Sequence, residues 1–136
     1  MLVDSQLLLS DQQDAKANGS KVSTNTIDMS VANRDIGAGV TLYAVVVIDA
    51  YTAGTNTAVT ISVITDNDAA LGSPTTILST PAIAAADISA GRVPIVIPIP
   101  PNLITERYLG LNYNCATAAT ALNVTAFIAK EVSSNI

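Results

Sequence analysis

Carboxylates are the side chains of this chain whose spacing could support chemistry. The sequence has no histidine and one cysteine, Cys115, which excludes Ser–His and Cys–His nucleophile pairs and Cys/His zinc sites. Asp66 and Asp68 are closely spaced, and paired carboxylates can hydrolyse glycosides. They also begin like a calcium loop, but that loop needs Gly and Glu where this chain has Leu71 and Ile77. Because turn-forming residues surround the pair, we expect Asp66 and Asp68 to form a turn.

The composition favours structure over catalysis. Charged residues make up 12% of the chain, against roughly 25% in ordinary globular domains. Hydrophobic residues make up 49%, in short runs rich in Val, Ile, Leu and Thr. A surface built from Thr, Ser, Asn, Gln and Ala costs little to desolvate, because no ions lose their water. We therefore expect a structural or binding β-domain in an assembly, and not an enzyme, with no cofactor and no metal.

The charge and hydropathy of the sequence argue against binding to nucleic acid, against a membrane span and against a signal peptide. The net charge is −5, and the six Lys and Arg residues are scattered, so no basic stripe is available for nucleic acid. No stretch approaches the roughly 20 apolar residues that span a bilayer. The N-terminus lacks a basic residue before its apolar run, so we expect no signal peptide and synthesis in a cytoplasm. Cys115 is expected to be a small apolar residue beside a strand, the alternative being a bridge between two subunits.

Strand patterns dominate the 136 residues, which we expect to form one domain, residues 1–136. At most one short helix is expected, and Ala82–Ala90 is the candidate segment, with Gly91 as a possible cap. About eight strands suggest a sandwich, a jelly roll or a closed barrel, and the scarcity of aromatic residues favours an antiparallel β-sandwich. The segments with strand or short apolar patterns are Gln6–Leu9, Val22–Asp28, Leu42–Ile48, Ala58–Thr65, Thr75–Ser79, Val93–Ile99, Arg107–Asn114 and Leu122–Ala129.

Two of these segments carry further information. Leu42–Ile48 is nearly continuously apolar, which indicates a strand buried on both faces or at a sandwich centre. In Val93–Ile99, Pro94 and Pro98 are separated by an even number of residues, so their backbone nitrogens point to the same side of the strand. Because proline has no N–H, neither residue donates a hydrogen bond on that side. This pattern predicts an edge strand that resists pairing with other sheets.

Four blocks of the sequence resemble a known family. They are Gln6–Asp11 (QLLLSD), Ser23–Asp28 (STNTID), Arg34–Gly39 (RDIGAG) followed by Leu42 and Tyr43, and Arg107–Tyr113 (RYLGLNY). In order and spacing they resemble the cement proteins of some tailed-phage capsids, of the Bordetella-phage type. The resemblance runs from near the N-terminus to about Lys130.

The resemblance implies a jelly-roll fold and a place on the outside of the mature capsid. It implies that the protein bridges neighbouring major capsid subunits, and that it forms a homo-oligomer, a dimer or a trimer. It carries over no catalytic residue. The alternative is a receptor- or glycan-binding β-sandwich of a tail fibre or surface protein, and a hydrolase on a β-sandwich is a third reading.

Two segments are candidates for contact with a partner. An apolar N-terminal arm within residues 1–10 could pair with a neighbour, the alternative being an ordinary first strand. The loop at residues 34 and 35 could contact a partner or hold an internal salt bridge. The candidate interface residues are Leu2, Val3, Leu7, Leu9, Arg34 and Asp35.

Overall fold

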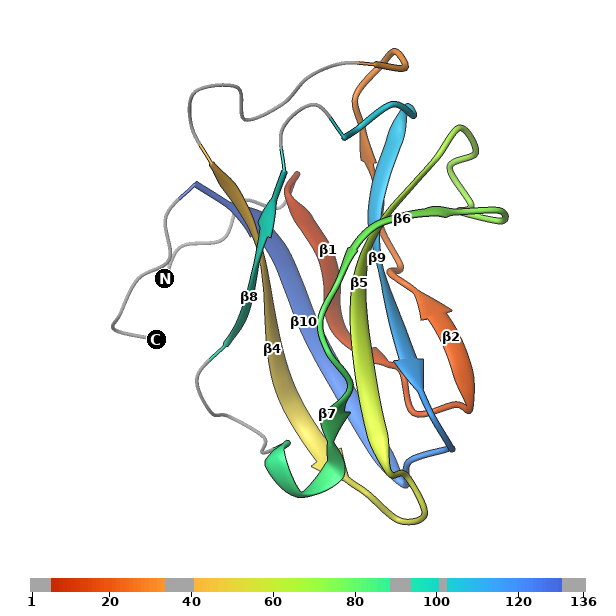
Figure 1. The fold of residues 1–136 in the computed structure, drawn as a ribbon, viewed down its shortest axis with the longest axis vertical. Helices are drawn as coiled ribbons and strands as arrows, with labels where there is room; N and C mark the ends of the chain where they lie inside the picture. The colour runs from red at the N-terminus through yellow and green to blue at the C-terminus, as the bar shows by residue number, and fades with distance from the viewer. Residues whose placement is uncertain (1–5, 34–40, 89–93, 101–102, 131–136) are drawn as a thin grey trace.

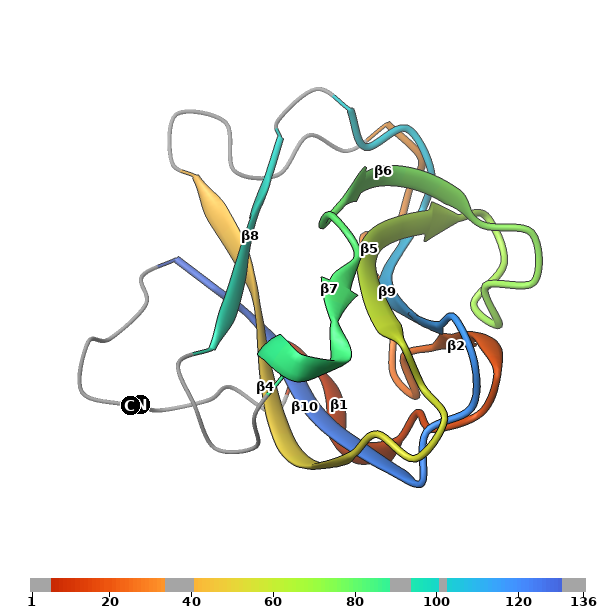
Figure 2. The ribbon, with the colours of Figure 1, turned by 60° about the horizontal axis from the view of Figure 1, so that its bottom comes forward.

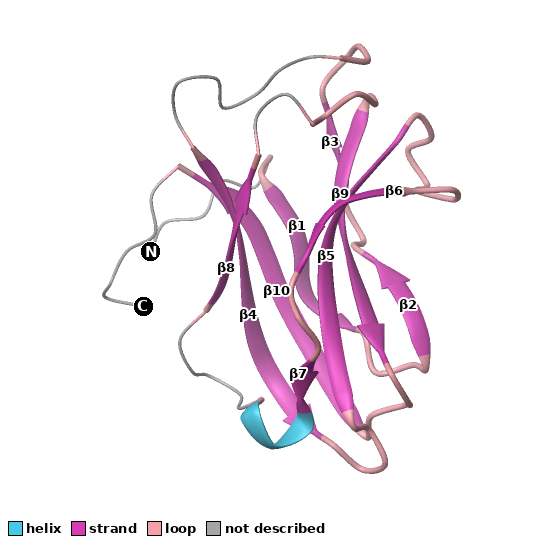
Figure 3. Ribbon diagram, in the orientation of Figure 1, coloured by secondary structure: helices cyan, strands magenta, loops and turns pink. Residues whose placement is uncertain are grey.

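Two antiparallel sheets pack face to face (Figure 1). The computed structural model describes residues 6–33, 41–88, 94–100 and 103–130. Sheet A has the order β1-β10-β4-β8. Its strands are β1 (Leu8–Asp14), β10 (Ala121–Ala129), β4 (Leu42–Thr52) and β8 (Ile95–Ile99). The predicted all-β sandwich is confirmed, and strands dominate the described residues (Figure 3).

Sheet B has the order β2-β9-β5-β6, with two short strands beside that path. Its main strands are β2 (Gly19–Val22), β9 (Tyr108–Cys115), β5 (Ala58–Asp66) and β6 (Thr75–Ser79). The short strand β3 (Ile27–Asp28) pairs with β9, and β7 (Ile83–Ala84) pairs with β5. Since β2 and β3 share one partner strand and β6 and β7 share another, each pair acts as one interrupted strand.

The strand order is that of a jelly roll. Counting β2/β3 and β6/β7 once each leaves eight strands among the described residues. The first strand pairs with the last (β1 with β10), the second with the seventh (β2/β3 with β9), and the third with the sixth (β4 with β8). The fourth then pairs with the fifth (β5 with β6/β7), as in one long hairpin rolled into two sheets.

The core fills the space between the sheets. Successive residues of a strand point to opposite faces, so one parity of each strand faces the other sheet. On β5 these are Val59, Ile61 and Val63, and on β4 they are Ala44, Val46 and Ile48, all of them buried. Each fully buried side chain of Val, Leu or Ile size contributes about 1.5–3 kcal/mol to folding. Figure 2 shows the two layers from the end, with β8 and the β6/β7 pair at their facing edges.

The predicted strand Val22–Asp28 is interrupted. Ser23 lies beside β9, where its N–H donates to Leu111 O and its Oγ accepts from Leu111 N–H. Asn25 then donates from its backbone to Leu9 O and from its side chain to Leu8 O. The chain therefore crosses from the edge of sheet B to β1 of sheet A at this point, which separates β2 from β3.

The candidate helix Ala82–Ala90 holds a strand and one 3-10 turn in its described part. Ile83 and Ala84 form β7, and only the 3-10 turn η1 (Ala85–Asp87) follows, while residues 89 and 90 lie outside the described residues. Ile83 is fixed in extended form by pairing with Val59, and Ala85 N–H donates to Thr57 O. Pairing with β5 therefore outweighs the helix propensity of the alanines.

The edge-strand prediction is confirmed for β8. Among the described residues this strand pairs only with β4 in sheet A, where Pro98 lies opposite Tyr43. Proline lacks the N–H that would project from the free side of the strand. The free edge of β8 therefore cannot present a complete row of donors to another sheet.

Candidate interaction surfaces

The predicted interface residues fall into three groups. Leu2, Val3, Arg34 and Asp35 lie outside the described residues. Leu9 is 0% exposed in the core, so its side chain serves the fold and offers no surface to a partner. Leu7 is half-buried against the core, and its carbonyl accepts the N–H of Ile128. Residues 8–10 thus begin an ordinary first strand, β1, and a contact role for Leu7 stays a prediction.

The outer face of sheet A carries a straight row of apolar side chains. Leu8 pairs with Phe127, Phe127 with Val45, and Val45 with Val96, so the row crosses all four strands. Because Ala44 and Val46 face the core, Val45 points to the opposite side. We call Leu8, Phe127, Val45 and Val96 the outer row.

Burial along the outer row is uneven. Val45 is 0% and Phe127 5% exposed, whereas Val96, at the β8 edge, is 39% exposed. The next row on the same face is Ala129, Tyr43 and Pro98. No Lys, Arg, Asp or Glu interrupts these two rows, so this part of sheet A is an uncharged, mostly apolar face.

The outer face of sheet B is polar, and two neighbouring rows across its middle carry no charged side chain. One row is Ser20, Asn114 and Thr60, and the next includes Asn112, Ser62 and Ser79. Ser62 and Ser79 share a hydrogen bond of 2.7 Å between their hydroxyls, and Asn112 donates to Ser20 Oγ at 3.3 Å. These side chains form hydrogen bonds without presenting ions to the solvent.

The loop between β5 and β6 covers one end of this polar face. Leu71, with φ at 54°, is 3% exposed, and a Cβ built on Gly110 would lie 2.5 Å from its Cδ1. Gly110 of β9 therefore leaves the space that the Leu71 side chain fills. Ile64 is buried on the same outer face, although it has the opposite parity to the core residues of β5.

Asp66 and Asp68 hold this loop in shape. Asp66 accepts the backbone N–H groups of Asp68 and Ser73, at 3.2 and 2.8 Å, and Asp68 accepts that of Ala70 at 3.0 Å. The bond from Ser73, followed by those from the other loop N–H groups, lowers the pKa of Asp66. The predicted turn role of this pair is confirmed.

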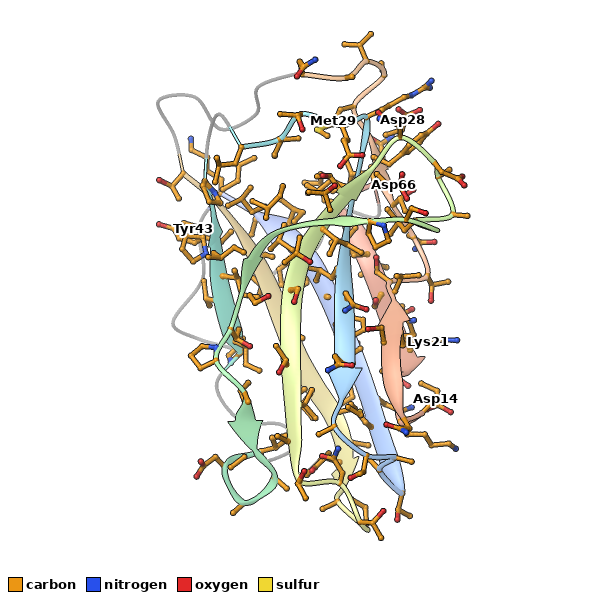
Figure 4. All side chains as sticks on the ribbon, turned by 45° about the vertical axis from the view of Figure 1, so that its right-hand side comes forward. Asp14, Lys21, Asp28, Met29, Tyr43 and Asp66 are labelled. Carbon is orange, nitrogen blue, oxygen red and sulfur yellow. The ribbon has the colours of Figure 1, made fainter. Side chains whose placement is uncertain are left out.

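An ion pair ties β3 to β9 at the same end of the molecule, where Figure 4 shows Asp28 near Asp66. Arg107 Nε and Nη2 donate to the two carboxylate oxygens of Asp28, at 2.7 and 2.8 Å. Its guanidinium carbon also lies 5.1 Å from the centre of the Tyr108 ring. The Arg107 bond, supported by Ser30 N–H, lowers the pKa of Asp28 to about 2.

Comparison with known protein families identifies the family of this chain. The sequence profile of Bbp16, a Bordetella phage protein family, matches residues 9–128. The chain belongs to the Bbp16 family. This membership is consistent with a phage protein. No curated protein matches the chain.

The Bbp16 chain shows no arrangement for metal chemistry in its described part. No group of three or more His, Cys, Asp or Glu side chains comes together there. No helix within the same residues is long and apolar enough to cross a membrane.

Inside the Bbp16 sandwich, a small polar network links the two sheets. Tyr113 of β9 and Ser10 of β1 share a hydrogen bond of 2.8 Å, and Ser10 Oγ also donates to Gln13 at 2.6 Å. Burial raises the pKa of the Tyr113 hydroxyl. Cys115 is 1% exposed with its thiol 3.3 Å from Ala15 O, so it is a buried free thiol, and burial raises its pKa.

The outer row was not predicted from the sequence, although the sequence pattern indicates which way some of its side chains point. The continuous run Leu42–Ile48 places Val45 on the face away from the core, and Val96 and Phe127 have the same off-core parity in their strands. Parity alone does not say that these residues are aligned. Their alignment depends on strand order and register, which pair Phe127 with Val45 and Val45 with Val96, residues far apart in the sequence.

Proposed function

We propose that this Bbp16 protein is a structural virion protein that cements the mature capsid by bridging neighbouring major capsid subunits on its outer surface. The uncharged polar face of sheet B is the observation that best supports this proposal. Membership of a phage family makes the virion the natural place for the chain, and we infer a structural rather than catalytic role.

The chemistry of this face suits burial against another protein. Thr60, Asn114 and Ser20 offer hydroxyl and amide groups that can exchange water for protein partners. Stripping water from such groups costs far less than stripping it from ions. A face of this kind can therefore be covered in a large interface without leaving a buried charge unpaired.

The proposed mechanism is that the protein binds the mature capsid lattice more tightly than other states of the lattice. A rigid sandwich that contacts two neighbouring subunits only in the mature lattice stabilises that lattice by mass action. Association with further copies of the chain, as a dimer or a trimer, would multiply these contacts.

The test compares heads that lack this protein with heads to which it has been added back. We expect added protein to raise the melting temperature of the heads. Thr60→Lys and Asn114→Lys, which place a charge on the polar face, should weaken binding to the heads. Ala86→Lys in η1, exposed at one end of the sandwich, is the matched control and should bind as the unaltered chain does.

Two results would contradict the proposal. Heads with and without the protein could melt at the same temperature, which would remove the stabilising role. Alternatively, Thr60→Lys, Asn114→Lys and Ala86→Lys could all bind equally well, which would exclude the polar face of sheet B as the contact.

A further inference from the structure

The turn that leads into β2 contains the pair Asn18-Gly19. The chain is held on both sides of this turn. Lys16 O accepts the N–H of Ala119 at 2.9 Å, and Gly19 begins β2 opposite Cys115 of β9. Between these anchors the side chain of Asn18 is exposed to solvent. Figure 1 shows the start of β2 at the outer edge of sheet B.

Gly19 leaves room for a reaction with its neighbour. Its φ is 87°, which glycine adopts without strain. Apart from its chain neighbours, no atom of the described residues lies within 4 Å of the place that a Cβ would take. Because β2 is an edge strand of four residues, its end opens at low cost. The backbone nitrogen of Gly19 can then approach the side-chain amide of Asn18.

Other asparagines of the sandwich are held more firmly. Asn56 is 5% exposed, and its side chain donates to two backbone carbonyls at 3.1 and 2.6 Å. Three further asparagines lie within the inner strands β9 and β10, and each precedes a residue whose own side chain shields the backbone nitrogen. They are Asn112, Asn114 and Asn123.

We propose that Asn18 is a site of spontaneous deamidation in the folded protein. The Gly19 nitrogen gives up its proton and attacks Asn18 Cγ. A bond forms between these two atoms, the bond from Cγ to the amide nitrogen breaks, and ammonia leaves with the proton. Water then opens the cyclic imide at either carbonyl and leaves an aspartate or an isoaspartate at position 18. Either product carries a negative charge that asparagine lacks.

The new carboxylate lies at the border of the polar face of sheet B. Asn18 is two residues from Ser20, the first member of the row Ser20, Asn114 and Thr60. Two residues of chain span at most about 7 Å, which is within the Debye length of about 8 Å in physiological salt. Covering the row then requires the charge to lose water or find a partner. This effect on binding rests on the proposed capsid contact, whereas deamidation itself does not.

Peptide mapping of the full folded protein tests the modification. Trypsin cleaves after Lys16 and Lys21 and releases residues 17–21, in which Asn18 is the one amide side chain. During incubation in neutral buffer this peptide should gain about 1 Da per event. The gain should accumulate about tenfold faster or more than in residues 108–130, because strands inside a sheet open far less often than the end of an edge strand. Asn18→Gln, which would have to form a larger ring, should keep its mass.

Binding to heads tests the consequence. Asn18→Asp, which reproduces the charge of the product, should bind heads several-fold more weakly than the unaltered chain. Ala86→Asp adds the same charge in η1, away from the polar face, and should bind as the unaltered chain does. Thr60→Lys, measured beside them, reports whether the polar face is the contact at all.

Each part of the proposal can be overturned separately. Equal mass gain in residues 17–21 and 108–130, or none in either, would show that Asn18 is no deamidation site. Unchanged binding of Asn18→Asp together with weakened binding of Thr60→Lys would leave the contact standing and remove the effect of deamidation on it. Unchanged binding of both variants would overturn the contact and this effect together, with the mass measurement unaffected.

Discussion

At the scale of single residues, side-chain size and hydrogen bonding decide where this chain tolerates change. Gly110, Tyr113 and the carboxylates of Asp28 and Asp66 each occupy a position with a defined physical requirement. Gly110 leaves space for a loop, Tyr113 joins the sheets, and the two carboxylates hold turns and a strand end.

Gly110→Ala should destabilise the fold by about 1–2 kcal/mol, because the added Cβ overpacks the space that Leu71 fills. That Cβ would lie 2.5 Å from Leu71 Cδ1 and 3.0 Å from Ser23 Oγ. Leu71→Ala alone should also destabilise the fold, by leaving a cavity. The double variant should be more stable than the sum of the two losses predicts, as measured by urea unfolding. Strictly additive losses would show that the two side chains do not compete for space.

Tyr113→Phe should cost about 1 kcal/mol, because it removes one buried hydrogen bond to Ser10. The raised pKa of Tyr113 has a further consequence above pH about 10, the ordinary tyrosine pKa. There the unfolded chain loses a proton that the folded chain keeps, so stability is full below that pH and falls as the pH rises. The Phe variant should lose part of this alkaline dependence in unfolding experiments at pH 8–11. An unchanged dependence would show that Tyr113 is not its source.

The lowered pKa values of Asp28 and Asp66 predict the acid behaviour of the protein. Both carboxylates stay ionised in the folded chain below the ordinary Asp pKa of about 3.9. The stability that they contribute is therefore present above pH about 4 and is lost as the pH falls through their lowered pKa values, which for Asp28 is about 2. Asp28→Asn and Asp66→Asn should each flatten the fall in melting temperature over this range, and Asp87→Asn in η1 is the control. If all three variants behaved as the unaltered chain does, these two carboxylates would not govern its acid stability.

At the scale of elements, strand edges and corners determine how the sandwich ends. The proline pattern predicted the β8 edge correctly, because a missing N–H restricts pairing whatever the fold around it. The segment Ala58–Thr65 was likewise expected as a strand and is β5 of sheet B, although from Ile61 onwards it is buried on both faces. The interruption at Ser23–Asn25 could not be predicted, because it depends on contacts with β1 and β9 that the local sequence does not contain.

Pro98→Thr should increase self-association, because it restores a backbone donor on the free side of β8. The melting temperature at low concentration should change little, since Pro98 donates nothing to β4. Sedimentation velocity over a range of concentrations measures the effect, with Val96→Thr as a control that leaves the backbone donors unaltered. Identical sedimentation of the Pro98→Thr variant and the unaltered chain would show that the prolines do not protect this edge.

At the scale of the whole molecule, uncharged rows on both outer faces distinguish this sandwich. Low charge could be read from the sequence, and so could an all-β domain. The separation into an apolar face on sheet A and a polar face on sheet B could not. Val45, Phe127 and Val96 become one row only when strand order brings β4, β10 and β8 together.

The copy number of this chain in purified phage particles tests the cement proposal most directly. Quantitative mass spectrometry against the major capsid protein provides the ratio. We predict a ratio near one, or a simple fraction of it, because a protein that bridges capsid subunits must repeat over the whole lattice. A handful of copies per particle would contradict this account and place the chain in a tail or fibre, and complete absence would remove it from the virion.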